Sequence, residues 1–91
     1  MNDLDEPERR VRATVRRIRD YCRRNGIPMA IDGAIDEETA ALMLGYAGAD
    51  SLRKQASDGT NRVPYRLLGN RRLYRDLDIA REIERSYSGG G

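Results

Sequence analysis

Apolar residues near the start of the chain recur at the spacing of one helix face. The steps between them are four, three and four residues, which is typical of an amphipathic helix. The positions are Val11, Val15, Ile18 and Cys22. We predict a helix over residues 6–25, with Asp5 as its N-cap and Glu8 as the second member of a capping box. Gly26 is placed to end this helix in the left-handed conformation, and Pro28 blocks its continuation.

The next segment, residues 27–35, alternates apolar and polar positions around Asp32-Gly33. Asp-Gly favours a tight turn of type I′. The segment is therefore compatible with a short strand, with a hairpin or with an extended linker.

A short helix is predicted over residues 37–44. Asp36 is a suitable N-cap, because an aspartate carboxylate accepts hydrogen bonds from the free N–H groups of the first turn. Ala40 and Ala41 are small enough to allow a second helix to approach closely, and Gly45 ends the helix.

A second short helix follows after a turn of small residues. We expect Asp50 or Ser51 to cap it and the helix to run to about residue 57. Leu52 and Ala56 lie four residues apart and form its inward face. The outward face then consists of Ser51, Arg53, Lys54 and Gln55.

Residues 65–68 and 71–74 flank Gly69-Asn70, a two-residue turn with glycine first, which favours a type II′ hairpin. This turn fixes the cross-strand pairs. They are Leu68 with Arg71, Leu67 with Arg72, Arg66 with Leu73, and Tyr65 with Tyr74.

A last helix is predicted from Asp76, as its cap, to about residue 87. Its inward residues are Leu77, Ile79, Ala80 and Ile83. We expect residues 88–91, which include three consecutive glycines, to form a disordered tail.

The composition indicates a small core, and the charges are segregated along the chain. The chain of 91 residues is 38% hydrophobic and 35% charged, and a chain of this length supports one modest core. Residues 27–50 contain five acids and no cation, whereas residues 53–75 contain seven cations and one acid, a net charge of +6. Such a basic block is expected of a surface that binds a polyanion.

The arginine-rich helix at the start of the chain has two interpretations. Residues 1–26 contain eight arginines and five acids. The helix could dock through its apolar stripe and leave a solvated cationic back. Alternatively, some of its arginines could contact phosphates or a neighbouring copy of the protein.

The inventory of reactive side chains argues against catalysis. Histidine is absent, and Cys22 is the only cysteine, so the most common general base and the usual ligands of zinc sites are missing. Neither of the common glycine-rich phosphate-binding motifs occurs. We therefore expect a binding protein, not an enzyme, with no cofactor, metal or small-molecule substrate. We also expect no membrane segment and a cytoplasmic location.

The order of these elements resembles a known family of DNA-binding proteins. The stretches that carry the resemblance are residues 40–45, 51–54, 63–66 and 72–77. Together they resemble the excisionase-like winged helix-turn-helix family, which includes phage excisionases, recombination directionality factors and AlpA-type regulators within the MerR-like group. The resemblance covers about residues 35–87. The turn before Leu52 is longer than in the family pattern.

The resemblance implies a mainly α fold with a small β-hairpin wing, preceded here by an extra basic helix. We interpret residues 1–26 as that helix, 27–87 as the winged helix-turn-helix domain and 88–91 as the tail. In such proteins the second helix of the pair enters the major groove and the wing reaches the minor groove. The implied DNA contacts are Ser51, Arg53, Lys54, Gln55, Arg62, Arg66, Asn70, Arg71 and Arg72. With about six phosphate contacts, log K would fall with log salt at a slope of about −5.

The function implied is that of an excisionase, which binds and bends attachment-site DNA and thereby promotes excision by an integrase. Its expected partners are double-stranded DNA, side-by-side copies of itself and an integrase. A small transcriptional regulator with the same fold is an alternative. A third possibility is a protein–protein adaptor that uses the arginine-rich helix.

Overall fold

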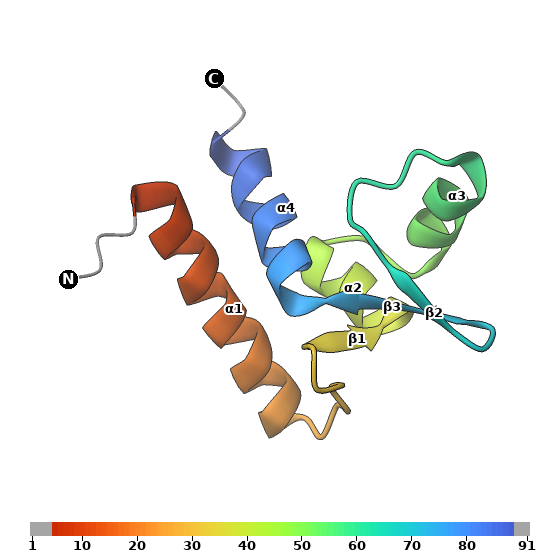
Figure 1. Cartoon of the computed structure of the whole chain (residues 1–91), viewed down its shortest axis with the longest axis horizontal. Coiled ribbons are helices and arrows are strands. Elements are labelled where there is room, and N and C mark those ends of the chain that lie inside the picture. The colour runs from red at the N-terminus through yellow and green to blue at the C-terminus, as the bar shows by residue number, and fades with distance from the viewer. Residues whose placement is uncertain (1–4, 89–91) are drawn as a thin grey trace.

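The molecule is mainly helical and contains a small three-stranded antiparallel sheet (Figure 1). The computed structural model describes residues 5–88. Helices α1 and α4 lie side by side at one end of the molecule, while α3 and the β2–β3 hairpin lie at the other. In chain order the elements are α1 (Glu6–Arg24), β1 (Ala34–Asp36), α2 (Glu37–Leu44), α3 (Asp50–Asp58), β2 (Arg66–Leu68), β3 (Arg71–Arg75) and α4 (Asp76–Ser88).

The first helix begins as predicted and ends one residue earlier. The Asp5 carboxylate accepts a hydrogen bond from the backbone N–H of Glu8 at 3.2 Å, which confirms the N-cap. At the other end the chain turns through Gly26 with φ of 64°, and the N–H of Ile27 donates to the carbonyl of Cys22 at 2.9 Å. This is a Schellman arrangement, which satisfies carbonyl groups that the helix end leaves free.

The sheet has the strand order β1-β3-β2. Of the interpretations open for residues 27–35, the strand is confirmed at its end, where β1 pairs with the distant β3. The chain enters β1 through a turn at Asp32-Gly33, and Gly33 has φ of 83°. Its carbonyl accepts a hydrogen bond from the N–H of Asp76 at 2.8 Å. The turn is thereby tied to the start of α4.

Helix α2 follows β1 directly, because Asp36 is both the last residue of the strand and the N-cap. Its carboxylate accepts from the N–H of Thr39 at 2.8 Å and from the Thr39 hydroxyl at 2.9 Å. Ala40 and Ala41 are fully buried, and Gly45 ends the helix with φ of 94°. The predicted cap, small-residue face and end of this helix are confirmed.

Helix α3 begins earlier than expected. Its N-cap is Ala49, which makes no side-chain cap hydrogen bond, so the prediction that Asp50 or Ser51 caps the helix is wrong. Ala49 is buried and closes the turn, which leaves Asp50 in the first helical turn, where the helix dipole favours a carboxylate. Leu52 is buried as predicted, and Gly59 ends the helix with φ of 72°.

The hairpin register is confirmed. Gly69 has φ of 63° and Asn70 does not have a positive φ, as expected for a type II′ turn. At the base of the hairpin the rings of Tyr65 and Tyr74 lie 5.7 Å apart between centroids. The paired residues are Arg66 with Leu73, Leu67 with Arg72, and Leu68 with Arg71.

Strand β3 runs into α4 without a loop, which changes the role expected for Asp76. This residue is the first of the helix, not a cap outside it, and it is only 1% exposed. Its carboxylate accepts from the Nε of Arg19 at 2.6 Å and from the N–H of Leu77 at 2.7 Å. Asp76 therefore joins α1 to the start of α4. The predicted inward residues Ile79 and Ala80 are fully buried.

One core cluster connects α1 with the sheet and the other helices. The stripe on α1, residues 11, 15, 18 and 22, belongs to the same cluster as Ile35, Leu52 and Tyr74. Helix α1 is therefore packed into the domain instead of standing apart from it.

Of the expected tail, only the backbone of Ser88 falls within the described residues, and residues 89–91 lie outside them. Within residues 5–88 no helix combines the length and apolar character needed to cross a membrane.

Candidate nucleic-acid interface

The outward face of α3 presents three of the predicted DNA contacts. Ser51, Arg53 and Lys54 are exposed, because Leu52 between them is turned into the core. The Nζ of Lys54 lies 3.6 Å from the carboxylate of Asp58, one turn further along. A surface pair of this kind contributes little to stability. These three side chains are therefore accessible to a partner.

Gln55 does not face outward as predicted. It is half-buried, and its amide donates a hydrogen bond to the hydroxyl of Tyr46 at 3.0 Å. The physical reason is helical spacing, because Gln55 follows the buried Leu52 by three residues and shares its side of the helix. The bond fixes the turn that precedes α3 against the helix itself.

The tip of the hairpin presents two further predicted contacts. Asn70 and Arg71 are exposed at the turn, and the neighbouring Leu67 and Leu68 are exposed as well. Within residues 5–88 the guanidinium of Arg71 has no acidic partner within ion-pair distance. Figure 1 shows the hairpin tip and α3 projecting at the same end of the molecule.

Two other predicted contacts, Arg66 and Arg62, interact with acids outside the hairpin tip. Arg66 is paired through its Nε with the Asp32 carboxylate at 3.0 Å, and this hydrogen bond is the main cause that lowers the pKa of Asp32. Arg62 lies in the loop between α3 and β2, where its charge helps Arg85 to lower the pKa of Glu82 on α4. Arg66 therefore shares a face of the hairpin with Arg71 but is held by Asp32, whereas Arg62 lies outside the hairpin.

The ninth predicted contact, Arg72, belongs to a cluster centred on Glu37. One oxygen of the Glu37 carboxylate accepts from the Nε of Arg72 and from the hydroxyl of Tyr74, each at 2.8 Å. The other oxygen lies 3.9 Å from a terminal nitrogen of Arg53. The Glu37 side chain is only 13% exposed. The first residue of α2 thus reaches both α3 and β3.

Electrostatics and packing hold this cluster in place. The hydrogen bond to Glu37 raises the pKa of Arg72, whose guanidinium also lies 5.7 Å from the centre of the Tyr65 ring, within cation–π range. Burial, followed by the hydrogen bond to Glu37, raises the pKa of Tyr74, so its hydroxyl remains a donor. The guanidinium of Arg72 is already engaged inside the protein.

Glu37 was not among the site residues predicted from the sequence. One signal was available. Arg72 and Tyr74 lie two residues apart and so share one face of the predicted strand. What the sequence did not contain was the pairing of β1 with β3, which places the start of α2 beside that face.

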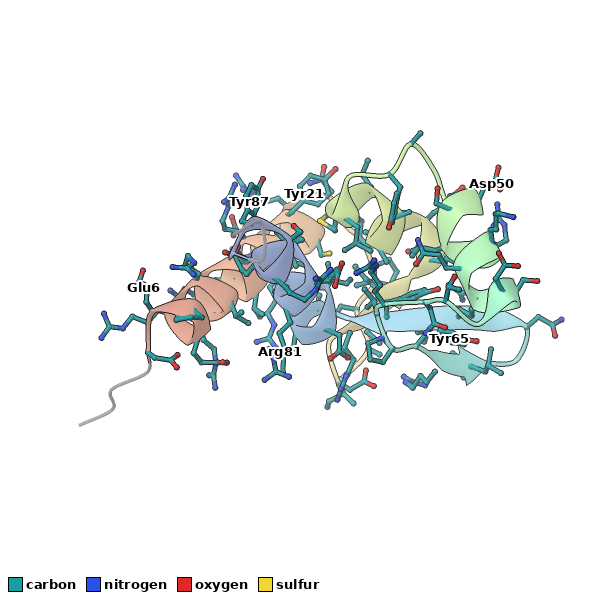
Figure 2. All side chains as sticks on the ribbon, turned by 90° about the horizontal axis from the view of Figure 1, so that it is seen from above. Glu6, Tyr21, Asp50, Tyr65, Arg81 and Tyr87 are labelled. Atoms are coloured by element: carbon teal, nitrogen blue, oxygen red, sulfur yellow. The ribbon has the colours of Figure 1, made fainter. Side chains whose placement is uncertain are left out.

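Four of the arginines of α1 are paired with acids of α1 and α4. Asp76 binds Arg19, and Glu84 lies 3.5 Å from Arg10. Arg23 and Arg24 both pair with Asp20. Figure 2 shows Tyr21 and Tyr87 on one side of the molecule, with Arg81 and Tyr65 on the opposite side.

Comparison of the chain with protein-family models, curated protein sequences and solved structures gave no match. Among residues 5–88, the structure contains no group of three or more acidic, cysteine or histidine side chains arranged to hold a metal ion.

Proposed function

We propose that this chain binds double-stranded DNA as a winged helix-turn-helix protein, with α3 as the recognition helix and the β2–β3 hairpin as the wing. One observation carries the proposal. The exposed cations Arg53 and Lys54 lie on α3, and the exposed Arg71 lies at the hairpin tip. Figure 1 shows these two elements at the same end of the molecule. Arg53 and Lys54 each have a surface carboxylate beside them, Asp50 and Asp58 respectively, and surface pairs of this kind are weak.

The chemistry of these side chains suits the two grooves differently. An α-helix fits the major groove, where arginine and lysine donate to guanine edges. Arg53, Lys54 and Ser51 are the residues of α3 placed for this role. An arginine in the minor groove responds mainly to groove width and potential, which suits Arg71 and its neighbour Asn70.

Salt dependence of binding tests the proposal. Arg62 lies outside the hairpin, and the acids that hold Arg66 and Arg72 are less exposed than those beside Arg53 and Lys54. About three cations are thereby left for phosphate contact, so the slope of log K against log salt should be about −2.7. Fluorescence anisotropy of a labelled duplex, titrated at several KCl concentrations, measures this slope.

Two variants sharpen the measurement. Arg71→Ala and Lys54→Ala should each reduce the magnitude of the slope by about 1. Arg24→Ala is a matched control, because it removes the same charge from the end of α1 while Asp20 keeps its partner Arg23. If all three variants have the slope of the unmodified protein, α3 and the hairpin are not the interface.

An excisionase role is the more specific part of the proposal and is supported by the resemblance of residues 35–87. In this role, several copies bind side by side on attachment-site DNA, bend it and assist an integrase. Footprinting on candidate sites tests the role. Adjacent protected repeats, with a bend detected by gel mobility, would support it. A single protected operator at a promoter would point to a transcriptional regulator.

Binding of a protein partner is a second candidate, and a specific surface favours it. An open cleft of about 650 Å³ lies between α1, α2 and α4. The apolar residues at its rim include Leu42, which is 58% exposed, and Tyr87, which is 81% exposed. Tyrosine is enriched at protein interfaces. This adaptor function would gain support if duplex DNA failed to bind at low salt.

A further inference from the structure

Glu37 is the side chain that reaches both parts of the proposed DNA-binding surface. It starts α2, but one carboxylate oxygen accepts hydrogen bonds from Arg72 and Tyr74 on β3, and the other faces Arg53 on α3. A single carboxylate, 13% exposed, thus links the proposed recognition helix to the base of the proposed wing. The distance between helix and wing determines whether both grooves of one duplex can be contacted together.

The same contacts affect the charge available for binding. Arg53 also pairs with Asp50 at 2.5 Å, so each of the two arginines beside Glu37 already interacts with a carboxylate. A phosphate that approaches either guanidinium must compete with the protein's own acid. This competition weakens binding that depends on charge alone, which is the main source of affinity for non-specific DNA.

We propose that Glu37 is a positioning residue for DNA selection. It fixes the spacing between α3 and the hairpin, and it lowers the attraction of the surface for DNA of arbitrary sequence. Discrimination improves when contacts with wrong partners are weakened as well as contacts with the right one strengthened. This inference rests on the proposed DNA-binding function and adds to it a residue that sets specificity.

The test compares Glu37→Gln with Glu38→Gln. Both substitutions remove one negative charge from the first turn of α2, but Glu38 is exposed and makes neither of the Glu37 hydrogen bonds. The glutamine at position 37 keeps an oxygen that can accept from Tyr74 and has nearly the same shape. Differences between the two variants therefore report on the contacts of Glu37, not on net charge.

Two labelled duplexes serve as probes. One is selected from a randomised library with the unmodified protein, and the other is a scrambled duplex of the same length. Dissociation constants are measured for both at fixed salt. We expect Glu38→Gln to lower both dissociation constants by a similar factor. Glu37→Gln should lower the dissociation constant of the scrambled duplex but not that of the selected one. The ratio of the scrambled to the selected dissociation constant should therefore fall by about tenfold, as expected for a coupling of ordinary size.

Glu37→Asp provides a second variant in case Glu37→Gln does not fold, with folding checked by urea denaturation. It keeps the charge but shortens the side chain, so the carboxylate no longer reaches Arg53 and Arg72 together. It should reduce the ratio of the scrambled to the selected dissociation constant without lowering the dissociation constant of the scrambled duplex. If Glu37 only stabilised the fold, its substitution would change the free energy of unfolding and leave this ratio unchanged.

The outcomes separate this inference from the function on which it rests. If the unmodified protein binds no duplex, the proposed function fails. If the unmodified protein discriminates and both Glu37 variants retain the ratio seen with Glu38→Gln, the role assigned to Glu37 is overturned while DNA binding stands.

Discussion

The turn at Gly33 should be one of the most sensitive single positions in the fold. Gly33 has φ of 83°, which L-residues with a side chain rarely adopt, and it faces the carboxylate of Asp76. A Cβ added at this position would lie nearest to the Oδ1 of Asp76, 2.8 Å from its Cγ and 3.0 Å from its Oδ2. Gly33→Ala therefore combines backbone strain with a collision.

The expected cost follows from these two effects. A non-glycine residue in the left-handed region costs about 1–2 kcal/mol. The Asp76 side chain cannot simply move aside, because it is 1% exposed and bonded to Arg19 and to the N–H of Leu77. Losing a hydrogen bond to a charged group costs about 1.5–3 kcal/mol. Gly33→Ala should thus lower the free energy of unfolding by about 2.5–5 kcal/mol, a large part of the roughly 5–14 kcal/mol expected for this length.

Urea unfolding followed by circular dichroism measures the effect, and two other glycines provide controls. Gly26→Ala introduces the same kind of strain at φ of 64° but meets no atom within 4 Å, so it should cost about 1–2 kcal/mol. Gly48 lacks a positive φ and is also unobstructed, so Gly48→Ala should change stability by less than about 1 kcal/mol.

A double-mutant cycle isolates the collision. Asp76→Ala removes the three side-chain atoms that the new Cβ would meet. In that background Gly33→Ala should cost only the strain, so the two substitutions should show a coupling of about 2 kcal/mol. A cost of Gly33→Ala no greater than that of Gly26→Ala, or one that is the same with and without the Asp76 carboxylate, would show that no collision occurs.

Three further predictions concern the core and the pH dependence of stability. Leu52→Ala should cost about 2–5 kcal/mol in urea unfolding, because Leu52 is 1% exposed and anchors α3; a loss below 1 kcal/mol would contradict this. Cys22 is 2% exposed, and burial, with smaller effects of Asp36 and Asp76, raises its pKa. Its thiol should react with Ellman's reagent at pH 8 only as fast as the protein unfolds, and fast labelling without urea would show that α1 separates from the core. The hydrogen bond from Arg85 lowers the pKa of Glu82 from 4.5, so its stabilising effect is present above about pH 4.5 and lost as the pH falls through the lower folded-state pKa. Glu82→Gln should therefore reduce the acid-side loss of stability in urea midpoints measured from pH 6 to pH 3, and an unchanged profile would show that the pair does not contribute.

Much of the candidate site could be predicted because its residues lie on short local elements. The outward positions of Ser51, Arg53 and Lys54 follow from helical spacing once Leu52 is taken as buried. The exposure of Arg71 follows from its place beside the turn at Gly69. The ion pairs of Arg66 and Arg72 could not be predicted in this way, because their partners, Asp32 and Glu37, lie 34 and 35 residues away in the sequence. Which acid engages which arginine depends on how the strands pair.

Local sequence is enough to specify most of the short elements of this protein. Asp5 and Asp36 accept hydrogen bonds from N–H groups three residues ahead, and the Gly69-Asn70 turn sets the hairpin register, so neighbouring residues are sufficient to specify them. The partner of β1 depends instead on long-range packing, because a three-residue strand acquires a partner only when a distant strand offers its free edge. That pairing of β1 with β3 places the start of α2 against the hairpin. It thereby brings Glu37 to Arg72 and Tyr74.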